Sequence, residues 1–208
     1  LQSTLPKLKE KYPELKEVHS KVLQHEVYRL FSNLRALAQL KKNGKKVGRL
    51  KFKGKGWFKT FTFNQSGFEL RKTGKKLDRL WLSKIGDIPI RVHGEIEGNI
   101  KQIVIKRYNS GEWYACVSAE AENEPEQKPI QKAVGLDVGL EHFTTDSDGK
   151  QIENPHHLKK TLKRLKRRQK KLSKKEKDSE NRNRQRMRVA SLHERVTNQR
   201  DDFLHKLS

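Results

Sequence analysis

A single carboxylate, Asp137, interrupts the apolar stretch Val134-Gly-Leu-Asp-Val-Gly-Leu140. A charged side chain in an apolar strand is costly unless something pairs with it. One such partner is Mg²⁺, which prefers oxygen ligands, and the flanking Gly135 and Gly139 would allow close approach of the backbone. The other is a nearby lysine, which would make Asp137 an ordinary residue at the end of a strand. The stretch taken alone leaves both interpretations open.

A strongly basic segment follows. Residues 155–200 contain 18 Lys and Arg but only 4 Asp and Glu, a net charge of +14. Like charges four residues apart disfavour a helix that lacks a counter-surface, whereas contacts with phosphates would neutralise them and give salt-dependent binding. The charges could also simply keep the helix solvated. We predict phosphate contacts from the following side chains: Lys159, Lys160, Lys163, Arg164, Arg167, Arg168, Lys170, Lys171, Arg184 and Arg188.

Lysines and aromatic residues are interleaved between Lys51 and Phe63. Basic side chains bind phosphates, and aromatic faces can stack on exposed bases. Phe61 and Phe63 share one face of a predicted strand, which favours a place in the core. Trp57, which follows a glycine, is the better stacking candidate. The predicted nucleic-acid contacts of this stretch are Lys51, Lys53, Lys55, Trp57 and Lys59.

Composition narrows the class of protein. The net charge of +23 over 208 residues favours a polyanionic partner. No apolar run approaches the roughly 20 residues that span a bilayer, and residues 1–25 lack the apolar segment of a signal peptide. We therefore expect a cytoplasmic protein with no membrane partner. Cys116 is the only cysteine, which excludes an internal disulfide and a cysteine-based zinc site.

These side chains require elements that position them. Residues 1–46 have a helical period, with Leu23, Val27, Leu30, Leu34 and Leu37 on one predicted buried face. A stop at Asn43-Gly44 ends the helix. Six short segments with period-two alternation then predict an antiparallel β-barrel or sandwich.

A polar stretch at residues 122–131 contains two prolines and predicts a linker. A strand at residues 132–139 and a hairpin follow it. From Asn154-Pro155 onward the pattern is helical, with Asn154 as the predicted cap and Pro155 in the first turn. Two narrow apolar stripes predict that the helices pair as an antiparallel hairpin. The fold class expected from these elements is α+β.

The motifs occur in a specific order that resembles a known family. Gly135-Leu-Asp-Val-Gly-Leu140, the turn Asp146-Ser-Asp-Gly149 and the helix Leu192–Leu207 are similar to the start of the RuvC nuclease domain in TnpB (OrfB-type) proteins. These proteins are encoded by insertion sequences and are related to the type V CRISPR effectors. Upstream, Val47-Gly-Arg-Leu-Lys-Phe-Lys53 and the pair Trp113-Tyr114 add to the resemblance, which covers nearly the whole chain.

The resemblance implies three regions: residues 1–46 as the remainder of a helical REC region, 47–127 as a WED-like β-barrel, and 128–208 as the first part of an RNase H-like RuvC domain. It implies a transposon-encoded, RNA-guided and metal-dependent DNA endonuclease. Its partners would be guide RNA and target DNA in a prokaryotic cytoplasm, at the nucleoid when bound to DNA. Asp137 would be a catalytic Mg²⁺ ligand.

The resemblance also implies that segments are missing at both ends. These would include the second catalytic carboxylate, the zinc ribbon and the last catalytic aspartate, so this stretch contains no zinc ligands. We expect the 208-residue chain alone to be inactive as a nuclease. The alternative is a non-cleaving RNA- or DNA-binding module, a truncated or domesticated relative. A ribosomal-protein-like RNA binder fits the charge but not the ordered motifs.

Overall fold

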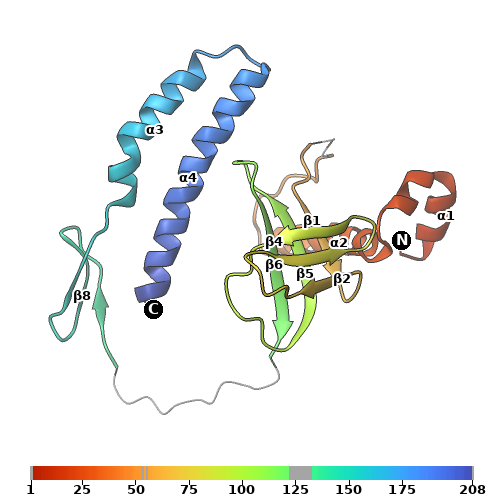
Figure 1. Cartoon of the computed structure of the whole chain (residues 1–208), viewed down its shortest axis with the longest axis horizontal. Helices are drawn as coiled ribbons and strands as arrows, with labels where there is room; N and C mark the ends of the chain where they lie inside the picture. Colours follow the sequence, from red (N-terminus) through yellow and green to blue (C-terminus); the bar gives the residue numbers. More distant parts are fainter. Residues whose placement is uncertain (1, 53, 55, 122–132, 208) are drawn as a thin grey trace. The chain divides into compact units, whose positions relative to one another are not determined.

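The computed structural model describes residues 2–52, 54, 56–121 and 133–207 (Figure 1). The chain forms two compact units, the first made of Leu1–Tyr108 with Trp113–Glu124 and the second of Asn109–Glu112 with Pro125–Ser208. Both units combine helices with antiparallel strands, so the α+β class is confirmed. The region boundaries at residues 46 and 127 stay predictions. The predicted linker, residues 122–131, lies outside the described residues.

The first unit begins with helices. Its helical elements are η1 (Gln2–Thr4), α1 (Leu5–Lys11), η2 (Pro13–Glu17) and α2 (Ser20–Lys42). The end of α2 agrees with the predicted stop: Gly44 has a φ of 71°, in the left-handed region that favours glycine. The Lys45 N–H donates to the Leu40 carbonyl at 3.0 Å, and the Gly44 N–H to the Lys41 carbonyl at 3.1 Å. This pair of bonds is the Schellman motif.

Strands form at all six segments where alternation predicts them. They are β1 (Thr60–Asn64), β2 (Phe68–Arg71), β3 (Asp78–Leu82), β4 (Gly86–Ile90), β5 (Asn99–Arg107) and β6 (Trp113–Glu120). They make two antiparallel sheets of order β1-β5-β6 and β2-β3-β4. Among the described residues no strand pairing joins these sheets. The predicted closed barrel is therefore wrong, and the strands form two open sheets. Alternation identifies strands and their faces, but it does not determine which edges pair.

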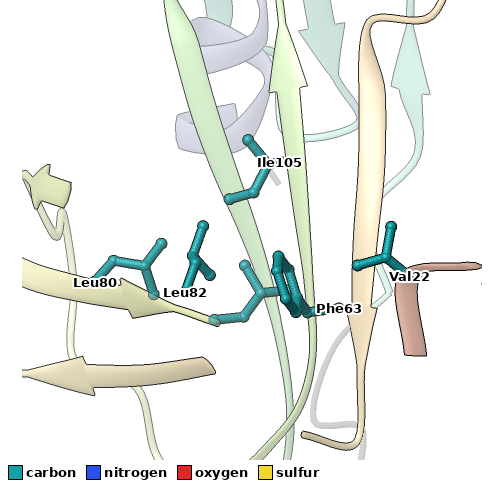
Figure 2. Packing of buried hydrophobic residues seen from close by; sticks show 6 residues of the cluster. Val22, Phe63, Leu80, Leu82 and Ile105 are labelled. Carbon is teal, nitrogen blue, oxygen red and sulfur yellow. The ribbon is translucent and has the colours of Figure 1, made fainter. Parts of the chain in front are cut away.

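The two sheets bury side chains in one core. Leu80 and Leu82 of β3 meet Phe63 of β1 and Ile105 of β5, and Val22 of α2 joins them (Figure 2). Phe61 packs against this cluster. The predicted core positions of the two phenylalanines are therefore confirmed. The central strand β5 pairs with β1 on one side and with β6 on the other.

Most of α2 lies outside this core. Only Val22 of the helix is buried, and Leu30 and Leu34 are 47% and 43% exposed. The predicted buried face is therefore wrong beyond the first turns, because no described element of the unit covers the C-terminal half of the helix. We call Leu30, Phe31 and Leu34 the α2 apolar stripe; all three are exposed.

The second unit contains a small antiparallel sheet and two helices. Its elements are β7 (Leu136–Asp137), β8 (His142–Asp146), β9 (Gln151–Glu153), α3 (His157–Ser173) and α4 (Glu180–Leu207), with sheet order β7-β8-β9. The strand expected over residues 132–139 shortens to the two residues of β7. Both are exposed, whereas Phe143 of β8 meets the Phe203 ring of α4 with centroids 4.9 Å apart.

The helix α3 begins later than its sequence predicts. Asn154 does not cap the helix; its Oδ1 instead accepts a bond from the His156 N–H at 3.0 Å. His156 is left-handed, with a φ of 49°, and the helix starts at His157. An asparagine side chain can close a local turn in this way as well as cap a helix. Pro155 consequently precedes the first turn.

The helices α3 and α4 lie side by side as an antiparallel hairpin, which confirms the predicted pairing (Figure 1). Their apolar contact is narrow and consists of Leu165, Leu172, Val189 and Leu192. None of the helices in the described part of the chain combines the length and the apolar character needed to cross a membrane.

Candidate nucleic-acid interface and acidic site

Asp137 lies at the end of β7 with an exposed side chain. Its backbone is well held: the Asp137 carbonyl accepts a bond from Thr144 Oγ1 at 2.8 Å, and Asp137 pairs with Thr145 of β8. Thr144 is buried on that strand. Asp137 takes part in none of the ion pairs within the described residues. The lysine partner that the alternative interpretation requires is thus not found there.

The described residues do not by themselves fit a magnesium site. They contain no group of three or more His, Cys, Asp or Glu side chains that could hold a metal ion. One oxygen of the Asp146 carboxylate on β8 bonds to the following turn: its Oδ1 accepts bonds from the N–H groups of Asp148 (3.0 Å) and Lys150 (2.8 Å). Asp137 therefore offers a single carboxylate, and a metal centre with several protein ligands is not complete within these residues.

The α3–α4 hairpin concentrates positive charge. In α3, nine of 17 residues are Lys or Arg and none is acidic. Many of them stand four apart, as do Lys159 and Lys163, where like charges repel. In the first turns of α4 the pair Arg184–Glu180, at 3.6 Å, offsets little of this because both groups are exposed. The predicted contact residues on the hairpin that are exposed to solvent are Lys159, Lys160, Lys163, Arg164, Arg167, Lys170, Lys171, Arg184 and Arg188.

Arg168 differs from these residues because it is half-buried and joins the two helices. Its Nη1 donates to the Arg188 carbonyl at 2.9 Å. Partial burial, followed by the neighbouring charges of Arg164, Arg188 and Arg167, lowers the pKa of its guanidinium. The guanidinium nevertheless stays charged at neutral pH. Arg168 thus positions the hairpin in addition to contributing charge to it.

Gln185 is a positioning residue that the sequence analysis missed. It is buried between the helices, and its Nε2 donates to the Arg168 carbonyl at 3.0 Å. The signal was present in the sequence: Gln185 precedes Val189, Leu192 and Val196 at helical spacing, so it occupies an interior position of the stripe. The narrow apolar contact between the helices is thus supplemented by two side-chain bonds to backbone carbonyls.

The basic and aromatic stretch after α2 forms no regular element between Lys51 and Lys59 in the described residues. Lys51, Trp57 and Lys59 are exposed, whereas Lys53 and Lys55 lie outside the described residues. The Lys59 carbonyl accepts a bond from the Arg107 N–H at 2.7 Å, which holds this stretch next to the end of β5. These residues belong to the first unit and the α3–α4 hairpin to the second.

Known proteins resemble this chain in sequence. A family model for OrfB proteins, described as "Probable transposase", matches residues 116–208. A curated protein of Streptomyces pristinaespiralis named "Putative RNA-guided DNA endonuclease" is 32% identical over 148 residues, 71% of this chain and 34% of that protein. An Escherichia coli (strain K12) protein, "Putative RNA-guided DNA endonuclease InsQ", is 31% identical over 162 residues, 76% of this chain and 38% of that protein.

The chain spans about a third of the length of these two relatives. The family match includes Asp137 and the α3–α4 hairpin, and the matches to the relatives cover more than two thirds of the chain. The chain therefore belongs to the TnpB-type (OrfB) family.

Proposed function

We propose that this chain is the nucleic-acid-binding part of an RNA-guided DNA endonuclease, with guide RNA and target DNA as its partners. The observation that carries this proposal is the exposed basic surface of the α3–α4 hairpin. The hairpin lies within the residues that match the transposase family. The proposed activity, RNA-guided cleavage of DNA, is taken from the names of the two relatives.

The physical support comes from the balance of charge on the hairpin. The helices are held together by a short apolar contact and by the bonds of Arg168 and Gln185. That contact must overcome the repulsion between lysines and arginines spaced four apart on α3. A phosphate backbone along this surface would remove the repulsion and release condensed counterions. The surface thus suits RNA or DNA recognised through its backbone.

We propose that β7–β9 correspond to the start of a RuvC-like domain and that Asp137 is one carboxylate ligand of Mg²⁺ in its complete site. The exposed carboxylate on a firmly bonded strand end supports this proposal. The further ligands that such a site needs would come from outside the described residues. We accordingly propose, as a second function, that this chain by itself binds nucleic acid without cutting it. This proposal is favoured because the described residues contain no group of side chains that could hold a metal ion.

The test is the salt dependence of binding by the 208-residue chain. Fluorescence anisotropy would give affinities for a structured RNA and a DNA duplex between ~50 and ~200 mM salt. The wild-type affinity should fall by orders of magnitude over that range. Replacing Lys163, Arg164 and Arg167 with Gln should reduce the log–log slope for the duplex by about 2 to 3.

The matched control replaces Lys72, Lys75 and Lys76 with Gln. These lysines are exposed around the turn between β2 and β3, so the control loses the same net charge. It should retain most of the wild-type slope. A wild-type affinity that does not depend on salt, or equal losses in the two triple variants, would contradict a binding role for the hairpin.

A further inference from the structure

A histidine joins the helical part of the first unit to its sheets. His19 caps α2 through its backbone, because its carbonyl accepts bonds from the N–H groups of Val22 (3.0 Å) and Leu23 (3.3 Å). Its half-buried ring lies 5.5 Å from the Phe63 ring of β1, measured between centroids. Val22 belongs to the buried core, and Val18 packs against that core. The imidazole therefore lies where α2 meets the sheets.

A glycine lets the same ring approach the backbone of the turn between β1 and β2. A Cβ atom on Gly67 would lie 2.6 Å from His19 Cε1 and 2.7 Å from Nε2, closer than side chains in proteins approach one another. The Gly67 carbonyl accepts a bond from the Ser83 N–H at 2.8 Å, which holds the turn in place. We call the contacts of the His19 ring with Phe63 and Gly67 the His19 contact.

The His19 contact suits a neutral ring. Nδ1 of His19 is buried and has no hydrogen-bond partner in the part of the chain that the structure describes. A neutral imidazole carries an N–H on one nitrogen only, whereas the protonated ring carries one on each. Protonation would therefore leave a buried N–H donor without an acceptor, which costs free energy.

The charges around the ring are positive. Lys9 Nζ of α1 donates to Ser20 Oγ at 2.8 Å. Lys21 Nζ of α2 donates to Gln65 Oε1 at 3.1 Å, in the turn that contains the glycine. Lys84 adds a third positive charge from the turn between β3 and β4. The ring takes part in none of the ion pairs that the described residues form, so no carboxylate there compensates a proton.

The pH range follows from the direction of the pKa shift. Burial, followed by the charges of Lys9, Lys21 and Lys84, lowers the pKa of His19 below its ordinary value of 6.5. The unfolded chain therefore binds this proton more readily than the folded chain does. The stabilising effect of the contact is complete above pH 6.5, and it is lost as the pH falls from there through the lowered pKa of the folded state.

We propose that the His19 contact is a pH-sensitive switch between the helical part and the sheets of the first unit. While the ring is neutral, the first turns of α2 stay packed on the core. When the ring takes up a proton, these turns detach and expose Val22. The switch does not depend on nucleic-acid binding, so its failure would leave the proposed function unchanged.

The first measurement is amide hydrogen exchange of the 208-residue chain at about pH 7.5 and about pH 5, on either side of the ordinary pKa of histidine. Each rate is divided by the intrinsic rate at that pH. Protection in the first turns of α2, including Val22 and Leu23, should fall by at least about fivefold at the lower pH, the smallest effect of a buried donor without an acceptor. Protection in β5 and β6 should be retained.

Two results of this measurement would overturn the proposal. Equal loss of protection in α2, β5 and β6 would show that the whole unit unfolds instead of releasing the helix. Unchanged protection in α2 would show that protonation does not affect the contact.

The substitution His19→Phe replaces the imidazole with a ring that cannot take up a proton. Protection in α2 should then be the same at the two pH values. His193→Phe is the matched control, because His193 is exposed on α4. The control should show the same fall as the wild type. If His19→Phe also shows that fall, another group causes it and the proposal fails.

A second variant keeps His19 and changes its surroundings, so it is decisive even if the His19→Phe chain does not fold. Lys84→Gln removes one positive charge, and it should raise the pKa of His19 and reduce the fall in protection. Lys72→Gln removes an exposed lysine that is not among the charges acting on the ring, and it should change neither quantity. NMR titration of the His19 ring protons measures the pKa. Equal effects of the two substitutions, or a wild-type pKa at or above 6.5, would contradict the switch.

Discussion

At the scale of single residues, Asp137 combines an exposed carboxylate with a firmly bonded backbone. The Thr144 hydroxyl bond and the ladder to β8 hold the strand end, while the side chain points to solvent. The sequence indicated the carboxylate because an acidic residue in an apolar stretch is unusual. It could not show that the stretch is exposed, because burial depends on elements that the pattern itself does not contain.

The prediction at this scale concerns the substitution Asp137→Ala. It would be tested in a protein that contains this sequence and is as long as the two relatives. Guided cleavage of DNA should fall by more than about a hundredfold, because losing even an outer partner of a metal ligand costs about 10- to 100-fold. Binding of RNA and target should persist, because the basic hairpin is unchanged. Cut product and bound complex would be measured at the same Mg²⁺ and salt concentrations.

Glu141→Ala is the control, since it removes an exposed carboxylate from the same segment. It should cut like the wild type. If the Asp137→Ala variant still cuts DNA, Asp137 has a structural role only. A joint loss of cutting and binding would indicate misfolding.

At the scale of elements, the sequence predicted where helices and strands form better than what covers them. The alternation that places Phe63 in the core was sufficient because both sides of that contact lie in the described residues. The helical stripe around Leu30 was misleading, because a helix shows an apolar face whether or not its partner is present. Asn154 was misassigned as a cap because its side chain serves local turns equally well.

The prediction at this scale concerns the contact between α3 and α4. Gln185→Ala removes the bond from Nε2 to the Arg168 carbonyl and leaves a gap in a narrow interface. The free energy of unfolding of the hairpin should fall by about 1 kcal/mol, the usual net value of such a bond. Amide hydrogen exchange in α3 would report the loss.

Gln169→Ala is the matched change, because Gln169 is exposed on α3 and the substitution is chemically identical. Its helix propensity change is small and favourable. It should therefore leave exchange in α3 unchanged or slower. Equal acceleration in both variants would exclude a positioning role for Gln185.

At the scale of the whole molecule, the predicted nucleic-acid contacts are distributed over both units. The first unit holds the stretch around Trp57, and the second holds the hairpin and Asp137. Family membership follows from sequence matches that cover most of the chain, which single residues could not establish. The closed barrel could not be verified from the sequence, because closure depends on pairings between distant edges rather than on local alternation.

The α2 apolar stripe has a consequence for handling the protein. A net charge of +23 keeps copies of the chain apart in dilute buffer. Salt that removes bound nucleic acid also shortens the Debye length, from about 10 Å at 0.1 M to about 3 Å at 1 M. Leu30 and Leu34 of neighbouring molecules can then meet. Light scattering should detect self-association as salt rises, and it should be absent from a Leu30→Gln, Leu34→Gln variant. If the variant associates equally, the colloidal instability arises elsewhere on the surface.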